Sequence, residues 1–392
     1  MKQFVIIGGG IIGTTIALEL ARRGAGPVTV LEKESSLGRH ASGRNSGVIH
    51  SGINQKPGSL KARMCVEGSK RLREYCRKKN VPMNECGTLV AARRPEEIKV
   101  LERLLAMGRQ SGVPGLEIID ERELKKREPR ALGMAALLSP TGAAVDSRAL
   151  LNSLAEDAHE EDVRFELARS VVRIDGHRIL TSDGEWKADH IINSAGLHAD
   201  KIAHSMGVGK EYQVVPFRGE YFEVKGCDVR SMIYQPPDLR FPFLSIHLTR
   251  ETDGRVLAGP SAVLAFGREA YEKEWVWPEM IEMFRSPQFL RLVTSRAFLS
   301  MAFQNLKTSF SKRAFLKEVQ SLVPGVREDE LVPYRSGIRA QLVDRRGRLV
   351  DDLLVEFQEG STHILNAVSP GMTSSLAFAE WVADRLTGRR PV

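Results

Sequence analysis

"FVIIGGGIIGTTIALELARRGAGPVTVLEKE", residues 4–34, reads as a strand, a glycine-rich turn, a helix and a second strand. Residues 4–7 are an apolar run long enough for a buried parallel strand. Residues 11–23 repeat apolar side chains at helical spacing until Gly24, a typical helix stop. A second apolar run, residues 28–31, ends at Glu32. This order predicts a nucleotide-binding βαβ unit at the start of a parallel sheet.

The turn contains a complete G-x-G-x-x-G fingerprint, and each position has a physical role. Gly8 permits the tight turn, Gly10 lets the backbone approach a pyrophosphate, and Gly13 lets helix and strand pack closely. The N-terminus of the helix offers free N–H groups to the phosphates. Glu32 stands about 20 residues further on, where an acid binds a ribose diol and repels the 2′-phosphate of NADP. The fingerprint therefore predicts a dinucleotide and leaves both NAD and FAD open.

The next segment favours FAD. "GRHASGRNSGVIHSGI", residues 38–53, is rich in glycine and polar residues and precedes a helix expected to begin near Pro57. An NAD enzyme usually enters its next βα unit here, whereas this loop suits a chain that follows an extended cofactor toward its reactive ring. We predict that Arg44, Asn45 and Ser46 contact the cofactor and that His50 reaches the reacting centre. His40 is expected to serve the loop or the phosphates.

Composition excludes several classes of protein. The 392 residues are 42% hydrophobic and 27% charged, as in soluble globular proteins. The longest apolar run is too short and too glycine-rich to cross a membrane, and the charged residues that follow it do not fit a signal peptide. The net charge of +8 is scattered and shows no basic stripe interleaved with aromatics, so acidic small molecules are favoured over nucleic acid. Four cysteines without metal-ligand spacing indicate reduced thiols and no metal site. We expect a cytoplasmic protein; peripheral association with the inner face of the membrane stays open.

Several longer motifs are distributed along the chain: "VIIGGGIIG", "LEKE", "SGRNSGVIHSGI", "KPGSLKA", "VPFRGEYF", "FPFLSIHLT", "GPSAVLAFGREAY", "GIRAQ" and "LVDD". Together they resemble the FAD-dependent L-2-hydroxyglutarate dehydrogenases and oxidases, within the wider D-amino-acid-oxidase-like flavoprotein superfamily. The resemblance runs from residue 3 to about residue 385. Two departures bear on the substrate: Asn54 and Gln55 replace two tyrosines of the family pattern, and "NAVSPGMTSS" replaces "NAPSPAATSS".

The resemblance implies an α/β (α+β overall) fold in which a Rossmann-like FAD-binding domain is interleaved with an antiparallel-sheet substrate domain. The FAD-binding domain would comprise residues 1–85, 145–210 and 335–392, and the substrate domain residues 86–144 and 211–334. Alternating apolar and turn residues over 211–265 agree with an antiparallel sheet, and residues 275–320 are expected to be helical.

The expected site residues combine the fingerprint with the resemblance. His50 and His247 are the catalytic candidates, because a neutral imidazole suits a base near pH 7. One is expected to accept the proton and the other to anchor the substrate; His247 is favoured as the base because it lies in the expected substrate-side sheet. Arg339, Arg218 and Tyr234 are the substrate-binding candidates, since a guanidinium fork matches a carboxylate; core packing is an equal alternative for Tyr234. The predicted residues for noncovalent FAD are Gly8, Gly10, Ile12, Gly13, Glu32, Lys33, Arg44, Asn45, Ser46, Gly47, Val171, Ala195, Gly196, Gly337, Arg339, Gly371, Met372 and Thr373.

The expected reaction is oxidation of a 2-hydroxy acid, above all L-2-hydroxyglutarate to 2-oxoglutarate, by hydride transfer to flavin. The sequence has no second G-x-G-x-x-G for a nicotinamide, so the electrons are expected to pass to oxygen or a quinone-type acceptor. Two alternatives stay open: an amino-acid or imino-acid oxidase on the same scaffold and, suggested only by the charge, a flavin-containing nucleic-acid-binding or modifying protein.

Overall fold

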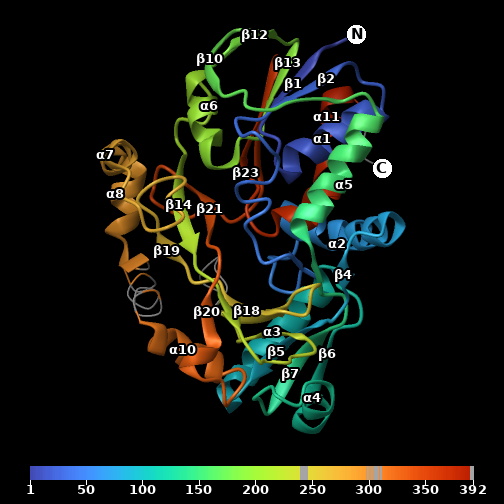
Figure 1. Ribbon diagram of the computed structural model, residues 1–392, viewed down its shortest axis with the longest axis vertical. Coiled ribbons are helices and arrows are strands. Elements are labelled where there is room, and N and C mark those ends of the chain that lie inside the picture. The colour runs from blue at the N-terminus through green and yellow to red at the C-terminus, as the bar shows by residue number, and fades with distance from the viewer. Residues whose placement is uncertain (239–245, 297, 300–301, 303–308, 310, 389–392) are drawn as a thin grey trace.

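The computed structural model describes residues 1–238, 246–296, 298–299, 302, 309 and 311–388. A mainly parallel sheet with helices packed on it and a larger antiparallel sheet occupy opposite ends of the molecule, and β14 and β21 run between them (Figure 1). The chain passes from one sheet to the other several times. The predicted α/β fold with an interleaved antiparallel sheet is therefore confirmed.

The parallel sheet is built around β1, whose four residues are all fully buried. Its strand order is β22 (Leu354–Gln358), β23 (Ser361–Asn366), β13 (His190–Asn193), β1 (Phe4–Ile7), β2 (Val28–Leu31) and β9 (Arg164–Glu166). All neighbours pair in parallel except β22 and β23. The accompanying helices are α1 (Ile11–Arg22), α2 (Leu60–Lys79), α5 (Ser147–Glu160), α6 (Ala199–Ser205) and α11 (Gly371–Thr387). Contacts between α1 and α5, α1 and α11, and α11 and α2 join four of these helices into one layer.

The antiparallel sheet has helices on both faces. Its order is β20 (Leu331–Pro333), β15 (Phe222–Val224), β18 (Val256–Gly259), β17 (His247–Arg250), β16 (Met232–Tyr234), β5 (Thr88–Ala92), β7 (Ala135–Ser139) and β6 (Glu117–Asp120). All neighbours pair antiparallel except β16 and β5, which pair in parallel. Side chains alternate across a strand. Leu89 of β5 accordingly packs in the cluster of Phe315 from α10 (Lys312–Gln320), while Val90 packs with Leu101 from α3 (Pro95–Gln110).

Smaller sheets connect these two layers or extend them. One contains β19 (Val263–Leu264), β14 (Gln213–Gly219) and β21 (Gly337–Val343), one contains β3 (Val48–Ile49), β8 (Ala143–Val145) and β4 (Met83–Asn84), and one contains β10 (Val171–Asp175), β11 (Arg178–Thr181) and β12 (Gly184–Lys187). The remaining elements are α4 (Glu121–Arg127), α7 (Trp277–Arg285), α8 (Pro287–Val293) and the 3-10 turns η1 (Gly196–His198) and η2 (Glu328–Glu330). Helix α8 packs against β14 and β21.

The sequence located most of the early elements correctly, and local chemistry explains the differences. The helix expected near Pro57 begins at Leu60, because the Ser59 hydroxyl caps it by accepting from the Ala62 N–H. The loop of residues 38–53 contains the two-residue strand β3, which pairs with β8. Within the described residues, we find no helix with the length and apolar character needed to cross a bilayer.

Candidate active site

The glycine turn brings β1, α1 and the end of β13 into contact. Gly8 has φ +105°, and a Cβ there would lie 2.7 Å from the Ser194 carbonyl oxygen. A Cβ on Gly13 would clash with the Gly8 carbonyl and lie 2.6 Å from the Ser194 hydroxyl oxygen. Any side chain at either position would force the helix away from the strands. These two glycines thus fix the close packing that the fingerprint requires.

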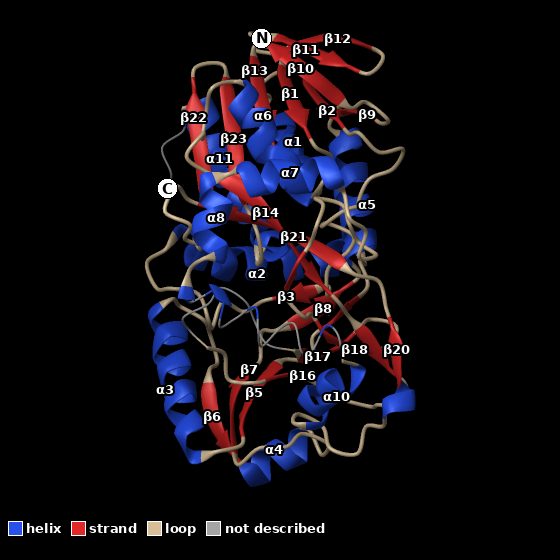
Figure 2. Ribbon diagram, turned by 90° about the vertical axis from the view of Figure 1, so that its left-hand side faces the viewer, coloured by secondary structure: helices blue, strands red, loops and turns tan. Residues whose placement is uncertain are grey.

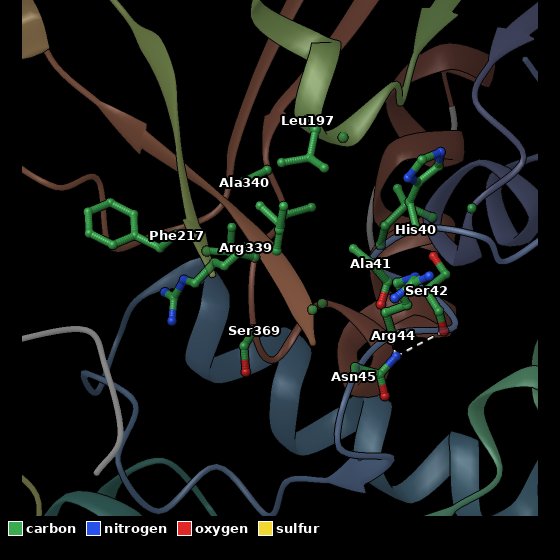
Figure 3. Close-up of a pocket in the computed structure, with 18 of the residues that line it drawn as sticks. His40, Ala41, Ser42, Arg44, Asn45, Leu197, Phe217, Arg339, Ala340 and Ser369 are labelled. Carbon is green, nitrogen blue, oxygen red and sulfur yellow. Dashed lines mark hydrogen bonds between the residues drawn. The ribbon is translucent and has the colours of Figure 1, made fainter. Parts of the chain in front are cut away.

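A cavity of about 1600 Å³ begins at this turn and reaches the space between the two sheets. It lies at the carboxyl ends of the parallel strands, where α/β sheets bind their ligands. Figure 3 shows the His40–Asn45 loop on one side, with Arg339, Ala340 and Phe217 across from it. Gly10 and Glu32 line one end, and His50 and His247 line the other.

Nearly all of the predicted cofactor residues line this cavity. Those that do are Gly8, Gly10, Ile12, Glu32, Lys33, Arg44, Asn45, Ser46, Val171, Ala195, Gly196, Gly337, Arg339, Gly371, Met372 and Thr373. Gly13 and Gly47 are not among the lining residues. Gly13 packs beneath the turn, and Gly47, with φ +64°, lets the chain pass close to the Val145 carbonyl.

Glu32 directs a carboxylate into the first end of the cavity. Its two oxygens accept from the Gly9 N–H at 2.8 Å and the Glu34 N–H at 3.0 Å. A carboxylate has about four lone-pair sites, so it retains capacity for a ligand hydroxyl. The Ser42 hydroxyl oxygen accepts from the Ile11 N–H at 2.9 Å, and the other first-turn N–H groups of α1 have no partner within the helix. An acceptor for a diol and donors for phosphate therefore lie side by side.

The loop between β2 and β3 is braced by its own side chains. The Asn45 amide nitrogen donates to the Ala41 and Ser42 carbonyls at 3.0 and 2.9 Å, and its oxygen accepts from the Gly47 N–H at 2.8 Å. Arg44 donates to the Arg39 carbonyl at 3.0 Å, and its guanidinium lies 4.2 Å from the centre of the Tyr271 ring. Arg44 and Asn45 thus shape the loop as well as line the cavity.

A charged cluster joins this loop to the segment after β19. Lys33 contacts Glu34 at 2.8 Å and Glu269 at 2.6 Å, and His40 contacts Glu34 at 2.9 Å and the Tyr271 hydroxyl at 2.7 Å. Glu34, His40 and Glu269 are close enough together to hold a metal ion. The Lys33 ammonium, however, touches both carboxylates and offsets part of their charge.

His50 follows β3, is partly buried as a residue and lines the cavity. Its backbone N–H donates to the Thr373 hydroxyl at 3.0 Å, which ties it to the start of α11. Burial, together with the nearby His247, Lys61 and Arg339, lowers the pKa of His50 to about 3. The imidazole is therefore neutral at pH 7 and able to accept a proton.

His247 lies on β17 and is only 3% exposed, although it lines the cavity. Tyr234 stacks on it with ring centres 4.1 Å apart and planes 10° apart. Tyr234 itself is not a lining residue, and among the described residues its hydroxyl has no hydrogen-bond partner. Its position is that of a packing support for His247. Residues 241–245 of the motif before His247 lie outside the described residues.

The two arginine candidates are placed differently. Arg339, on β21, lines the cavity, and burial lowers its pKa to about 10. Arg218, on β14, is not a lining residue and donates to the Ala270 carbonyl and Glu220, both at 3.4 Å.

Sequence reasoning missed Lys61, a cation beside Arg339 in the cavity wall. Lys61 is only 5% exposed, and its ammonium donates to the Asp351 carboxylate and carbonyl, both at 3.0 Å. Asp352 accepts from the Leu60 and Lys61 backbone N–H groups and so caps α2. The sequence feature that could have pointed to Lys61 as a site residue is its place in the "KPGSLKA" motif, in the first turn of the expected helix.

Tyr221 and the pair Asn54–Gln55 also line the cavity, together with His50 and His247. Tyr221 lines the cavity, and burial raises the pKa of its hydroxyl to about 12. Asn54 and Gln55, which depart from the family pattern, also line it and are joined by a 3.0 Å hydrogen bond. The departures therefore lie where they can contact a substrate.

Comparisons with known proteins agree with this geometry. Residues 3–385 match the family model described as FAD dependent oxidoreductase. An L-2-hydroxyglutarate dehydrogenase from Indibacter alkaliphilus is 38% identical, covering 98% of this chain and 99% of its own. The human mitochondrial L-2-hydroxyglutarate dehydrogenase is 36% identical, covering 99% and 89%.

Solved structures share the fold at lower identity. An L-alpha-glycerophosphate oxidase from Mycoplasma pneumoniae with FAD bound aligns with a TM-score of 0.78 at 22% identity, covering 100% of this chain and 96% of its own. A glycine oxidase from Geobacillus kaustophilus aligns with a TM-score of 0.74 at 17% identity over the same shares. The chain belongs to the FAD dependent oxidoreductase family.

Proposed function

We propose that this enzyme oxidises a short 2-hydroxy dicarboxylate, L-2-hydroxyglutarate in the first place, to the corresponding 2-oxo acid. The observation that carries the proposal is one cavity that His50, Arg339 and Lys61 line together and that continues to the dinucleotide fingerprint. The near full-length relatives named L-2-hydroxyglutarate dehydrogenase support the choice of substrate.

The residues present fit FAD. A Cβ on Gly10 would lie 2.9 Å from the Ser42 hydroxyl oxygen, whereas Cβ positions on Gly196 and Gly371 would meet open space. We expect Gly8, Gly10 and α1 to hold the pyrophosphate and Glu32 the ribose. Bound FAD supplies the hydride acceptor. The N-terminus of α11, at Gly371–Thr373, would favour negative charge on the neighbouring group.

Within this site, the side chains divide the work on the substrate. His50 accepts the proton of the C2 hydroxyl, since it is neutral and lines the cavity. Arg339 and Lys61 bind the carboxylates, and His247, fixed by Tyr234, positions the hydroxyl. The sequence favoured His247 as the base because it lies on the antiparallel sheet; the greater accessibility of His50 from the cavity favours the reverse assignment.

The experiment that tests the proposal is reduction of the enzyme's flavin without air by a panel of acids. L-2-hydroxyglutarate should bleach the flavin faster than D-2-hydroxyglutarate, L-lactate, glycine or L-proline. Faster bleaching by an amino or imino acid would favour the alternative oxidase. Reoxidation by oxygen and by a soluble quinone then identifies the acceptor class, for which we propose oxygen or a quinone.

We predict that FAD is bound noncovalently. None of the four cysteines lines the cavity, and Cys65 and Cys76 are buried. Acid precipitation should release all of the flavin into the supernatant, measured by its absorbance. Colour that stays with the precipitated chain would contradict noncovalent binding.

Glu32→Arg is expected to weaken FAD binding by more than about 2 kcal/mol, roughly 30-fold, because a charged acceptor for the ribose becomes a donor. Flavin fluorescence during titration of the apoprotein measures this. Glu166→Arg is the matched control, since Glu166 ends the neighbouring strand β9 and does not line the cavity. Equal FAD affinity in both variants would show that Glu32 does not bind the ribose.

A further inference from the structure

Lys56 and Arg103 are two cations that the wall of the cavity shares with the surface of the molecule. Both residues are exposed, and both line the cavity. They come from separate segments: Lys56 lies between β3 and α2, and Arg103 lies in the middle of α3. Residues that are exposed and also line a cavity lie where that cavity opens to solvent. The cavity therefore has an opening between these two segments.

Core packing holds α3 against the segment that carries Lys56. A Cβ on Gly108 of α3 would lie 3.6 Å from the Cα of Ile53, so the helix and the turn after β3 are in close contact. Ile53 also packs in the same apolar cluster as Leu101 and Leu104 of α3. Figure 2 shows α3 at the edge of the molecule, beside the antiparallel sheet. The two sides of the opening are thus set by apolar contacts beneath them, and the charged side chains are not needed to hold them in place.

One face of α3 borders the cavity. Arg103 and Met107 stand at i and i+4, on the same side of the helix, and both line the cavity. On the other segment, Asn54, Gln55 and Lys56 follow one another and all line it. We call Lys56, Arg103 and Met107 the rim. The rim is therefore continuous with the amide pair that departs from the family pattern, which lies on the substrate side of the cavity.

The charges of the rim are not used within the fold. Among the residues that the structure describes, neither Lys56 nor Arg103 has an ion-pair or side-chain hydrogen-bond partner. Two acids line this end of the cavity: Asp238, four residues after β16, and Asp351, whose carboxylate contacts the Lys61 ammonium at 3.0 Å. Four cations line the same end, namely Lys56, Arg103, Lys61 and Arg339. Positive charge therefore prevails from the opening inward.

We propose that the rim is the entrance for the substrate and that Lys56 and Arg103 select dianionic acids there by charge. A cleft lined by one sign of charge concentrates ions of the opposite sign and speeds their association. Coulomb energy is proportional to the charge of the ligand, so a dianion gains twice what a monoanion gains. Dicarboxylates are thus favoured before they reach Lys61 and Arg339. The choice of a 2-hydroxy dicarboxylate rests on the proposed function; the position and charge of the entrance do not.

The first test is the rate of flavin reduction in the FAD-loaded enzyme, without air, at L-2-hydroxyglutarate concentrations well below saturation. The double variant Lys56→Gln, Arg103→Gln should react about fivefold more slowly than the wild type at low ionic strength, and the two rates should converge at high salt. The limiting rate at saturating substrate should stay at the wild-type level. The matched control, Arg122→Gln with Lys126→Gln, removes the same net charge from exposed positions of α4, at the far end of the antiparallel sheet (Figure 2). It should react like the wild type.

Two further comparisons separate the charge of the rim from its position. With the monoanion L-2-hydroxybutyrate, the rim double variant should lose only about twofold at low ionic strength, because half the ligand charge gives half the Coulomb energy. Met107→Trp should slow the reaction of both acids equally and at every salt concentration, since a larger side chain narrows the passage without changing its charge. Full FAD content in each variant, read from the visible spectrum, shows that the fold is intact.

Quenching of flavin fluorescence by iodide tests the entrance without any substrate. At constant ionic strength, the rim double variant should lower the quenching constant of iodide about twofold and leave that of neutral acrylamide unchanged. If L-2-hydroxyglutarate failed to reduce the flavin while iodide behaved in this way, the proposed function would be wrong and the entrance would stand. Wild-type iodide quenching in the rim variant, wild-type reaction rates at low ionic strength, equal losses in the control pair, or equal losses for the two acids would each overturn the proposal.

Discussion

His50→Ala is expected to slow the reduction of flavin by saturating L-2-hydroxyglutarate by about 100-fold or more. The variant lacks the group that takes the hydroxyl proton, and no other imidazole occupies its position. Stopped-flow absorbance without air measures the limiting rate directly. FAD content, read from the visible spectrum, should equal that of the wild type, because the contact of His50 with Thr373 is made by its backbone N–H and survives the change.

The pH dependence of the same step should reveal how the substrate activates this base. In the free enzyme, burial and the surrounding cations hold the pKa of His50 at about 3, so the ring is neutral but weakly basic. A bound dicarboxylate would offset the charges of Lys61 and Arg339, and the pKa of His50 should rise toward the working pH. The limiting rate in the wild type should therefore fall in acid at a pH well above 3, and this limb should disappear in His50→Ala.

His247→Ala is the matched comparison, because it removes an imidazole from the same cavity. It should mainly raise the substrate concentration needed for half-maximal flavin reduction, since His247 positions the hydroxyl without taking its proton. The opposite pattern, with a slow limiting rate in His247→Ala alone, would exchange the two roles. Wild-type limiting rates and affinities in both variants would exclude both histidines from the reaction.

The cofactor half of the site could be predicted from the sequence because its signals are local. Gly8, Gly13 and Glu32 lie within one βαβ unit, and the spacing of that unit is set by one strand, one turn and one helix. The caps of α4 and α5 by Asp120 and Asp146 are equally local. The three-stranded sheet β10–β12 was not predicted, since its strands are short and largely exposed and lack a clear apolar pattern.

The substrate-binding part of the site could not be predicted in the same way. It depends on the register in which strands far apart in the sequence pair, and the sequence alone does not reveal that register. Strands β14 and β21 pair so that Phe217 is opposite Arg339 and Arg218 is opposite Ile338. Directly opposite residues point to the same face of a sheet, and neighbours along a strand point to opposite faces. Arg339 therefore shares the face of Phe217 while Arg218 points away to Glu220. A shift of one residue in this register would exchange the two arginines.

Arg339→Met is expected to raise the substrate concentration for half-maximal flavin reduction by roughly 100-fold. Charge-assisted hydrogen bonds to a buried ligand contribute about 1.5–3 kcal/mol, and methionine keeps the apolar volume while it removes the charge. Arg218→Met is the matched control on the paired strand and should leave substrate affinity near that of the wild type. Anaerobic titration of each variant, followed by flavin absorbance, gives both values.

Comparing the affinities of the variants for two acids identifies which carboxylate of the substrate Arg339 binds. L-2-hydroxybutyrate lacks the distal carboxylate of L-2-hydroxyglutarate. If Arg339 and Lys61 each hold one carboxylate, the variant that loses the partner of the distal carboxylate should lose part of its preference for L-2-hydroxyglutarate. The other variant should bind both acids more weakly by the same factor. If both cations hold the same carboxylate, the two single variants should affect each acid alike, and the double variant should lose less than the sum of the single effects, because the groups share one partner. Unchanged affinity in both single variants would contradict the proposed anchor, since the two cations in the cavity wall would then have no part in binding an anion.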